Sequence, residues 1–369
     1  MKSERILLIT WNFPPKKGGM ENLIYDIYTH LSLNYETEVI APCCHQKETA
    51  RIYRPKRKGF LYFAIYSVIK AASLKRNKKY DFVFGGSLAV LPILIILKIL
   101  LKAKYVAYVH GLDVIYNNAF YQLILKTCTP FMNGFVCNSR NTKALLTQRF
   151  KNLKNTTVIP PGMHAEKFPA QSARPYPRKY ILSVGRLTSR KGLIPFVENC
   201  FLYISKQFPD VDFLITGSEP KEAMYHKCGY EQQLRQCIKK NGLEKRVFLL
   251  GWVENDQKLA LYQHCECAVF PVVPLENDVE GFGMVAIEAG IMGRPTVAFN
   301  VGGIGDAIID GKTGTLIDSD DYPQMTGEIK KILQKQKYTN HDAIHKEVKR
   351  HYSWDKLLTR YDNFLHRIQ

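Results

Sequence analysis

The 369-residue sequence lacks the features that predict a membrane-spanning or exported protein. Its longest apolar stretch, residues 87–106, is broken by Pro92, Lys98 and Lys102. It therefore falls short of the roughly 18 to 20 uninterrupted apolar residues that a spanning helix needs. This stretch instead predicts a buried helix that leads into a strand. The first residues, "MKSER", pass directly into "ILLITW", which is too short for the apolar core of a secretory leader. We therefore expect a cytosolic protein.

Cysteine pairs with the spacing of metal or redox motifs are also missing. The nine cysteines include the neighbours Cys43 and Cys44 and the close pair Cys265 and Cys267, but no paired C-x-x-C. An odd total fits reduced thiols better than a disulfide framework, and no structural zinc is expected. The sequence also shows no internal repeat and no low-complexity segment.

Acidic residues are scarce in the first half of the chain. Residues 1–175 contain 26 Lys and Arg against 9 Asp and Glu, a net +17, whereas residues 176–369 contain 26 against 24, a net +2. Residues 51–79 hold ten basic residues and no acidic one, and aromatic residues are interleaved among them. These aromatics are Tyr53, Phe60, Tyr62, Phe63 and Tyr66.

This basic, aromatic segment leaves more than one interpretation open. It can dock on an anionic bilayer, since each Lys or Arg close to an acidic membrane contributes about 1 kcal/mol. It can also be a solvated surface that only aids solubility. Nucleic-acid binding is disfavoured, because no helix-turn-helix, zinc-finger or RNA-binding signature accompanies the charge.

Short apolar runs alternate with longer amphipathic ones along the chain. This alternation predicts an α/β protein in which mostly parallel sheets are covered by helices on both faces. In the first half we expect a helix at residues 20–33 and strands at 5–10, 36–42, 80–86, 105–111 and 134–139. In the second half we expect strands at 180–186, 212–218, 247–253, 267–273, 295–300 and 313–318.

Prolines accumulate between the two sets of strands, at positions 160, 161, 169, 175 and 177. Because proline fixes φ and removes a backbone donor, this segment is the best candidate for an interdomain linker. We predict a first doubly wound domain at residues 1–170 and a second at 171–351. Residues 352–369 predict an amphipathic helix whose large apolar side chains need a partner surface.

Ligands of such sheets bind outside the carboxyl ends of the strands, so motifs at strand-to-helix turns are the candidate site. Gly18 and Gly19 precede a helix after the first strand, where backbone N–H groups can face an oxyanion. A plain turn explains two glycines about equally well. In "SVGRLTSRKG", Arg186 and Lys191 follow the first strand of the second domain. A planar guanidinium and an ammonium suit a diphosphate.

Two glutamates eight residues apart form the third motif, "VEGFGMVAIEA". Glu288 is expected one turn into a helix that begins near Met284, and its carboxylate can accept from both hydroxyls of a nucleotide ribose. Glu280 can hold a transferred sugar, with help from N–H groups in the loop that follows it. Two surface glutamates around a loop are the alternative. The residues expected around Glu280 are Gly281, Phe282, Gly283 and Met284.

His110 ends a strand in "YVAYVHGLD", ahead of Gly111 and Asp113. A lone histidine is usually structural, but one at the carboxyl end of a parallel strand is a candidate site residue. Gly302 and Gly303 in "FNVGGIGD" end another strand and permit close backbone approach.

Together these motifs resemble the retaining, nucleotide-sugar-dependent glycosyltransferases of family 4. The resemblance covers most of the chain, and the order and spacing of the motifs make it specific. They are "GGME", "HGLD", "GRLTSRKG", "GWVENDQKLALYQHCECAVFP", "EGFGMVAIEA", "GGIGDAI", "DGKTG" and "SWDKL".

The resemblance implies the GT-B fold, two Rossmann-like domains facing a central cleft, with helix 352–369 packing back on the first domain. It assigns Glu288 to the ribose, Glu280 to the donor sugar, and Arg186 and Lys191 to the diphosphate. It assigns Gly19, beside Gly18, to the phosphate, and His110 to the donor sugar near the reacting carbon. Trp252 and Val253 would hold the base through backbone groups.

The resemblance implies a metal-independent enzyme with no cofactor beyond its nucleotide-sugar substrate. We expect transfer of a hexose to a glycan or lipid-linked acceptor at the cytoplasmic face of a membrane, in the synthesis of cell-surface polysaccharide, lipopolysaccharide or glycolipid. A nucleotide-sugar epimerase of similar fold and a non-catalytic nucleotide-sugar-binding protein are the alternatives. The sequence leaves the donor base, the sugar, the acceptor and the oligomeric state open.

Overall fold

The computed structural model describes residues 4–16, 18–44, 51–164, 172–220, 229–276 and 278–368. The chain divides into two compact units, residues 1–162 with 354–369, and residues 163–353. The predicted boundaries lie at 170/171 and 351/352, whereas the division of the structure falls at 162/163 and 353/354. Of the prolines in the predicted linker, Pro169 lies outside the described residues.

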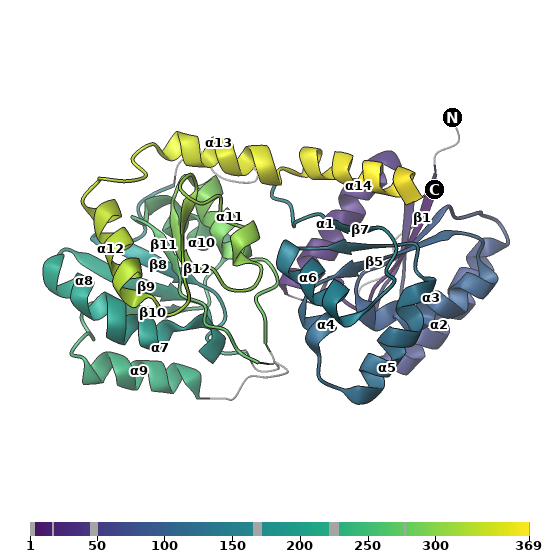
Figure 1. Cartoon of the computed structure of the whole chain (residues 1–369), viewed down its shortest axis with the longest axis horizontal. Helices are drawn as coiled ribbons and strands as arrows, with labels where there is room; N and C mark the ends of the chain where they lie inside the picture. The colour runs from purple at the N-terminus through teal and green to yellow at the C-terminus, as the bar shows by residue number, and fades with distance from the viewer. Residues whose placement is uncertain are drawn as a thin grey trace. The chain divides into compact units, whose positions relative to one another are not determined.

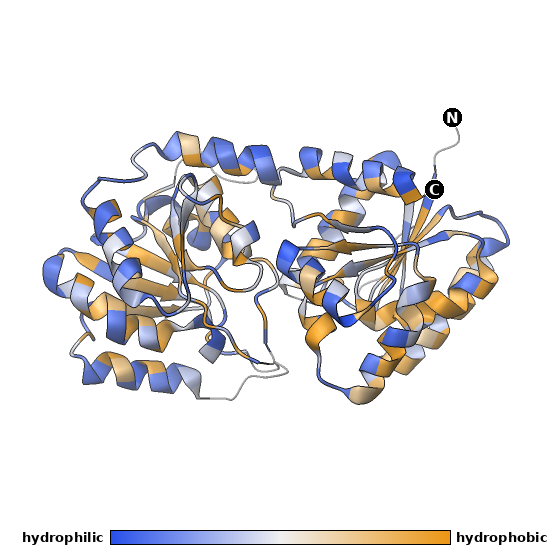
Figure 2. Ribbon diagram, in the orientation of Figure 1, coloured by the Kyte–Doolittle hydropathy of each residue, from blue (hydrophilic) through white to orange (hydrophobic). Residues whose placement is uncertain are grey.

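The first unit is built on a seven-stranded, all-parallel sheet with the order β3-β2-β1-β4-β5-β6-β7. Its central strands consist mainly of apolar residues, as the hydropathy colouring shows (Figure 2). The strands are β1 (Arg5–Ile9), β2 (Glu36–Ile40), β3 (Ile52–Tyr53), β4 (Phe82–Gly85), β5 (Lys104–Val109), β6 (Gly134–Cys137) and β7 (Thr156–Val158).

Two layers of helices cover this sheet (Figure 1). Leu7 and Ile9 of β1 face one layer, and Ile6 and Leu8 face the other, because successive side chains of a strand alternate between faces. The first layer contains α2 (Phe60–Lys75), α3 (Leu91–Leu100), α4 (Leu112–Ile115), α5 (Ala119–Cys128) and α6 (Arg140–Arg149). The second contains α1 (Gly19–Asn34) and α14 (Trp354–Ile368).

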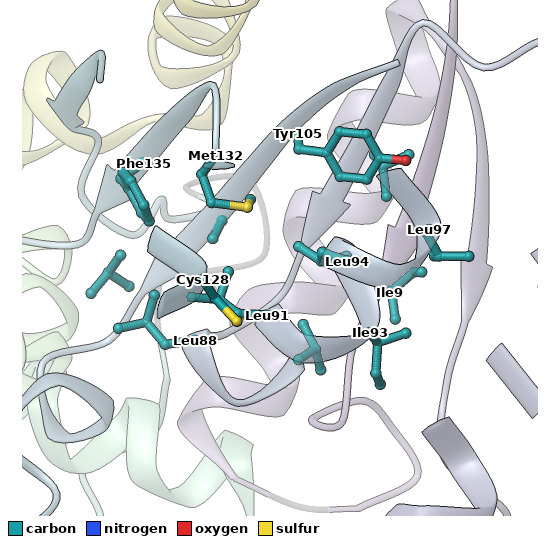
Figure 3. Close-up of a cluster of buried hydrophobic side chains, with 14 of the residues drawn as sticks. Ile9, Leu88, Leu91, Ile93, Leu94, Leu97, Tyr105, Cys128, Met132 and Phe135 are labelled. Atoms are coloured by element: carbon teal, nitrogen blue, oxygen red, sulfur yellow. The ribbon is translucent and has the colours of Figure 1, made fainter. Parts of the chain in front are cut away.

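The apolar stretch at residues 87–106 folds as predicted, as helix α3 followed by strand β5. Leu91, Leu94 and Leu97 belong to the buried apolar cluster that also contains Tyr105 of β5 (Figure 3). In the part of the chain that the structure describes, no helix has the length and apolarity needed to cross a membrane.

Helix α14 belongs to the first unit although it follows the second in sequence. Two glycines make room for its rings, because a Cβ on Gly162 would lie 2.6 Å from the indole of Trp354, and a Cβ on Gly134 would lie 2.6 Å from the ring of Phe364. The buried side of the helix consists of Trp354, Leu357, Tyr361, Phe364, Leu365 and Ile368.

The second unit is built on a six-stranded parallel sheet with the order β10-β9-β8-β11-β12-β13. Its strands are β8 (Lys179–Val184), β9 (Val211–Thr216), β10 (Val247–Gly251), β11 (Ala268–Phe270), β12 (Thr296–Phe299) and β13 (Gly314–Ile317). Its helices are α7 (Leu193–Phe196), α8 (Leu202–Gln207), α9 (Tyr230–Lys240), α10 (Asn255–His264), α11 (Met284–Ile291), α12 (Tyr322–Leu333) and α13 (His341–Tyr352).

The predicted α/β class with two Rossmann-like domains is confirmed, and every strand predicted from the sequence is present. The sequence missed the two edge strands of the first sheet, β3 and β7, which are only two and three residues long. The cysteines of the described ranges are all unpaired, and the reduced state expected from their number stays a prediction.

Candidate functional site

Both sheets reverse their strand order at one point, and several of the predicted site residues follow the strands beside it. In the second unit the reversal lies between β8 and β11, because β9 and β10 extend to one side of β8 and β12 and β13 to the other. The turn after β8 carries Arg186 and Lys191, and the loop after β11 carries Glu280. Ligands of open parallel sheets bind at such switch points, outside the carboxyl ends of the strands.

The turn after β8 places three cations close together. Arg186 is exposed, whereas Arg190 and Lys191 are buried in a short helical turn, η4 (Ser189–Lys191). Gly192 ends this turn in the left-handed conformation, with φ 63°, and a Cβ there would lie 1.9 Å from the carbonyl oxygen of Pro271. Glycine therefore allows the turn to pack closely against Pro271, the residue that follows β11.

Glu280 is bound by both buried cations. Its Oε2 accepts from Lys191 Nζ at 2.7 Å and from the guanidinium of Arg190. Arg190 Nε also donates to Asp278 Oδ2 at 2.8 Å, and Lys191 Nζ lies 4.4 Å from the centre of the Phe270 ring. The charge of Arg186 also lowers the pKa of Lys191, so Arg186 adds a third cation close to the two carboxylates. One positive charge is left in excess for an anionic ligand.

The electrostatics of this cluster keep Glu280 ionised. Burial alone would raise the pKa of Glu280, but the charges and hydrogen bonds of Lys191 and Arg190 lower it to about 2. Burial also lowers the pKa of Lys191, and the Glu280 charge partly opposes that change. A carboxylate with so low a pKa is a poor proton acceptor near neutral pH, so Glu280 is suited to accept hydrogen bonds.

The loop around Glu280 is fixed through its backbone. Gly303 N–H donates to the carbonyl oxygen of Glu280 at 2.7 Å, and a Cβ on Gly303 would lie 2.1 Å from the carbonyl oxygen of Gly281. Gly283, with φ 102°, is the residue before α11, and Phe282 is buried against Tyr352. The close approach predicted for the glycine pair is therefore made to the Glu280 loop.

Glu288 lies on the second turn of α11, which begins at Met284 as predicted. Its Oε1 accepts from Lys258 Nζ at 2.8 Å and its Oε2 accepts from Tyr262 OH at 2.9 Å. Lys258 and Tyr262 are four residues apart on α10, so they share one face of that helix. An ionised carboxylate has about four acceptor positions, so about two remain on Glu288 for a ligand.

Trp252 and Val253 follow β10. The Trp252 side chain is 60% exposed, and Val253 packs against the apolar cluster formed by β8, β9 and α10. The carbonyl oxygen of Gly251 is already used, since it accepts from Gly217 N–H at 2.8 Å and from Thr216 Oγ1 at 3.0 Å. Backbone contacts to a base would have to come from the residues after Gly251.

In the first unit, His110 directly follows β5 and is almost fully buried. Its Nε2 lies 2.8 Å from the carbonyl oxygen of Gly86, which can only accept, so Nε2 carries the proton. Asp113 accepts from the backbone N–H groups of His110, Gly111 and Leu88, each at 3.1 Å. Burial raises the pKa of Asp113, and His110 and these donors oppose the change.

Gly18 and Gly19 lie at the start of α1, after β1. A Cβ on Gly18 would lie 2.2 Å from Glu21 Oε2, whereas a Cβ on Gly19 would meet no described atom within 4 Å. Glu21 is buried and accepts from Asn12 Nδ2 at 3.0 Å. Gly18 therefore leaves room for a buried carboxylate, whereas the space beside Gly19 holds no described atom.

Within the second unit the structure brings Glu280 and Lys191 into direct contact and places Arg186 nearby. It holds Glu288 in a separate pair of hydrogen bonds. Sequence reasoning missed Arg190 as a partner of Glu280, although it stands directly before Lys191. It also missed Lys258 and Tyr262, for which the four-residue spacing on a helix was the available signal. The ligand-binding roles of the individual residues stay predictions.

No group of three or more His, Cys, Asp or Glu side chains in the described ranges is arranged to hold a metal ion.

Two family descriptions match the chain. "Glycosyl transferases group 1" matches residues 164–350, and "Glycosyltransferase Family 4" matches residues 17–167. The GDP-mannose-dependent alpha-(1-6)-phosphatidylinositol monomannoside mannosyltransferase of Mycolicibacterium smegmatis is 25% identical over 352 residues, which cover 89% of this chain and 89% of that protein.

Solved structures show the same fold at lower identity. Sucrose-phosphate synthase of Thermosynechococcus elongatus superposes with a TM-score of 0.79 at 19% identity, covering 99% of each chain. HepE of Anabaena in complex with UDP superposes with a TM-score of 0.77 at 17% identity, covering 98% of this chain and 100% of that chain.

Proposed function

Because the chain belongs to the group 1 glycosyltransferases, we propose that it transfers a hexose from a nucleotide-diphosphate sugar with retention of anomeric configuration. The acceptor in this proposal is a glycan or lipid-linked molecule at a membrane face. The observation that carries the proposal is the Arg190–Glu280–Lys191 cluster at the switch point of the second sheet.

The cluster supports the binding of a diphosphate beside a sugar. The three cations outnumber the two carboxylates by one, and the exposed Arg186 follows the carboxyl end of β8. Preorganised cations and N–H groups that face a leaving diphosphate can each contribute roughly 3 to 4 kcal/mol to the transition state. Glu280, ionised and fixed by its partners, can accept hydrogen bonds from sugar hydroxyls.

Glu288 supports the nucleoside part of the donor. About two of its acceptor positions remain while Lys258 and Tyr262 hold it, which matches the 2′- and 3′-hydroxyls of a ribose. The mannosyltransferase relative is named for GDP-mannose, and the HepE structure contains UDP. The proposal therefore covers UDP, GDP and ADP donors, with Trp252 and Val253 beside the base.

The proposed chemistry is a front-face displacement. The bond from the anomeric carbon to the diphosphate oxygen breaks, the bond to the acceptor oxygen forms on the same face, and the acceptor proton moves to the leaving phosphate. The low pKa of Glu280 argues against this residue as the proton acceptor. In this proposal His110 contacts the donor sugar, and Gly18 and Gly19 offer backbone N–H groups to the phosphate.

The proposal of an anionic or lipid-linked acceptor is supported by two observations. The first half of the chain carries a net +17, which favours an anionic surface or acceptor. The relative from M. smegmatis is named for a phosphatidylinositol monomannoside acceptor.

The anomeric configuration of the first product tests the reaction. The protein is incubated with each nucleotide sugar and a lipid-linked acceptor extract, and the new anomeric signal is followed by NMR from the earliest times. We expect an α-configured product from an α-configured donor. A β-configured product would exclude retention, and inversion at the sugar C2 without acceptor would indicate an epimerase.

A further inference from the structure

The outward side of helices α2, α3 and α5 exposes an unusual number of large apolar side chains. Of the 17 exposed large hydrophobic residues in the described ranges, ten lie between residues 60 and 131 of the first unit. Because α3 packs against both α2 and α5, these side chains belong to one layer of adjacent helices (Figure 2). We call this surface the α2–α3–α5 face; it consists of Phe60, Leu61, Tyr62, Ile65, Ile69, Ile96, Ile99, Phe120, Leu123 and Phe131.

Helix α2 shows that these side chains are not simply part of the core. Its buried side is formed by Phe63, Ser67 and Ala71, which are four residues apart. Leu61, Ile65 and Ile69, with the same spacing, form a second row that is 74%, 52% and 64% exposed. A helix that covers a sheet normally presents polar residues to water, so apolar residues on both sides indicate a second partner.

The charge around the α2–α3–α5 face has one sign. Residues 51–163 contain nineteen Lys and Arg and only two acidic residues. Asp113 is bound to three backbone N–H groups, and Asp81 accepts from Arg5 N–H at 2.9 Å, so both are used within the fold. The exposed cations next to the apolar side chains include Lys56, Arg57, Lys58, Lys75, Arg76, Lys98, Lys102 and Lys126.

We propose that the α2–α3–α5 face is the surface on which the protein lies on an anionic phospholipid bilayer, with its apolar side chains inserted between the lipid headgroups. The proposal rests on the membrane location given under the proposed function and specifies the surface that makes the contact. Basic residues surrounding apolar ones are the composition of an interfacial membrane surface.

Two other occupants fit the observations less well. Nucleic acids and acidic glycans bind through cations, hydroxyls and stacked rings, and aliphatic side chains such as Leu61, Ile65 and Ile99 contribute little to them. A second copy of the chain would bring two strongly basic faces together, and like charges at an interface are repulsive.

Vesicle sedimentation of the full-length protein tests the proposal. One set of vesicles contains phosphatidylcholine alone, and the other contains phosphatidylcholine with phosphatidylglycerol. The apolar variant carries Leu61→Gln and Ile65→Gln, and its matched control is Leu33→Gln on α1, on the other layer, where the side chain is 68% exposed. The charge variant carries Lys56→Gln, Arg57→Gln and Lys58→Gln, and its control carries Lys239→Gln, Lys240→Gln and Lys245→Gln in the second unit.

We expect the wild type to prefer the anionic vesicles by at least about tenfold, since each basic residue near the surface contributes about fivefold. The apolar variant should bind at least about tenfold more weakly at both low and high salt. The charge variant should bind anionic vesicles more weakly than the wild type mainly at low salt, because high salt already screens the charges of the wild type. Both controls should bind within about twofold of the wild type, and thermal melting should show all variants folded.

The proposal is overturned if the apolar variant binds anionic vesicles as the wild type does, or if the wild type shows no preference for them. Heparin or DNA can also be added to displace the protein from the vesicles. If they displace the wild type and the apolar variant equally well, the surface is a general polyanion site instead. Nucleotide binding is measured on the same proteins and should be unchanged. Failure of the wild type to bind any nucleotide would count against the proposed function and leave the vesicle result standing.

Discussion

Glu280 has a lowered pKa, and its contribution to stability follows from its two cations. Its pKa is about 2 in the folded protein, below the ordinary value of 4.5, so ionisation favours the folded state. That contribution is complete above about pH 4.5 and is lost as the pH falls toward about 2. A shift of this size corresponds to about 3 kcal/mol, of which about 2 kcal/mol is lost by about pH 3.

Glu280→Gln should therefore destabilise the protein most near neutral pH, because Arg190 and Lys191 would face an uncharged amide. The difference in unfolding free energy between wild type and variant should shrink by about 2 kcal/mol between about pH 6 and about pH 3. Urea denaturation of both proteins at a series of pH values measures this difference in unfolding free energy. The exposed Glu276, in the same loop, gives the matched control Glu276→Gln. A difference that does not change with pH would show that Glu280 is not held as an anion.

Tyr262 is expected to position Glu288. Its buried hydroxyl donates to Glu288 Oε2 at 2.9 Å, and a hydrogen bond to a charged group contributes about 1.5 to 3 kcal/mol. Tyr262→Phe should weaken nucleotide binding by about tenfold and change kcat little. Isothermal titration calorimetry measures the nucleotide affinity, and steady-state kinetics measure kcat.

Tyr180 provides the control for this substitution. It is equally buried in the same apolar cluster, but its hydroxyl donates to the carbonyl oxygen of Leu261 at 2.8 Å. Tyr180→Phe should leave nucleotide affinity unchanged. Equal losses in the two variants would mean that packing, and not the orientation of Glu288, explains the effect.

Among the connecting segments, the turn after β12 has the clearest structural task, because it supports the Glu280 loop. A Cβ on Gly303 would lie 2.1 Å from the carbonyl oxygen of Gly281 and would displace that loop. Gly303→Ala should cost about 1 to 3 kcal/mol of stability and lower transfer activity at least about tenfold.

Gly327 of α12 is the comparison, since a Cβ there meets no described atom within 4 Å. Gly327→Ala should stabilise the helix by about 0.5 to 1 kcal/mol and leave activity intact. Thermal melting of both variants measures the change in stability, and initial rates of transfer measure the change in activity. Full activity of Gly303→Ala would show that the glycine pair does not position Glu280.

Strands and helices of this chain were predictable where apolar periodicity is strong. The buried strands of both sheets and the amphipathic α14 are examples, because burial on both faces gives a strand a short continuous apolar run, and burial on one side gives a helix an apolar stripe. The edge strands β3 and β7 were missed because two or three half-buried residues leave no periodic pattern. For the site, glycine spacing and strand ends indicated Glu280, Glu288 and Lys191. The ion pairs of Glu280 depend on side-chain directions that sequence spacing does not specify.

The two-unit organisation of the chain depends on its last helix. Leu357 of α14 is fully buried in the first unit, whereas its neighbour Leu358 is only half-buried. Leu357→Ala should lower the unfolding free energy by about 2 to 5 kcal/mol, and Leu358→Ala by clearly less. Urea denaturation of both variants tests the docking of α14, and equal small losses would contradict it.

Nucleotide binding by the second unit is the most direct test of the central claim. Thermal unfolding of wild type, Glu288→Ala and Lys191→Ala is measured with UDP, GDP, ADP and CMP and their common sugar conjugates. A ligand at about 100 times its dissociation constant adds about 2.7 kcal/mol to stability. The account predicts that a nucleoside diphosphate stabilises the wild type and neither variant. Stabilisation of all three proteins alike, or of none, would contradict the donor site built around Glu280, Lys191 and Glu288.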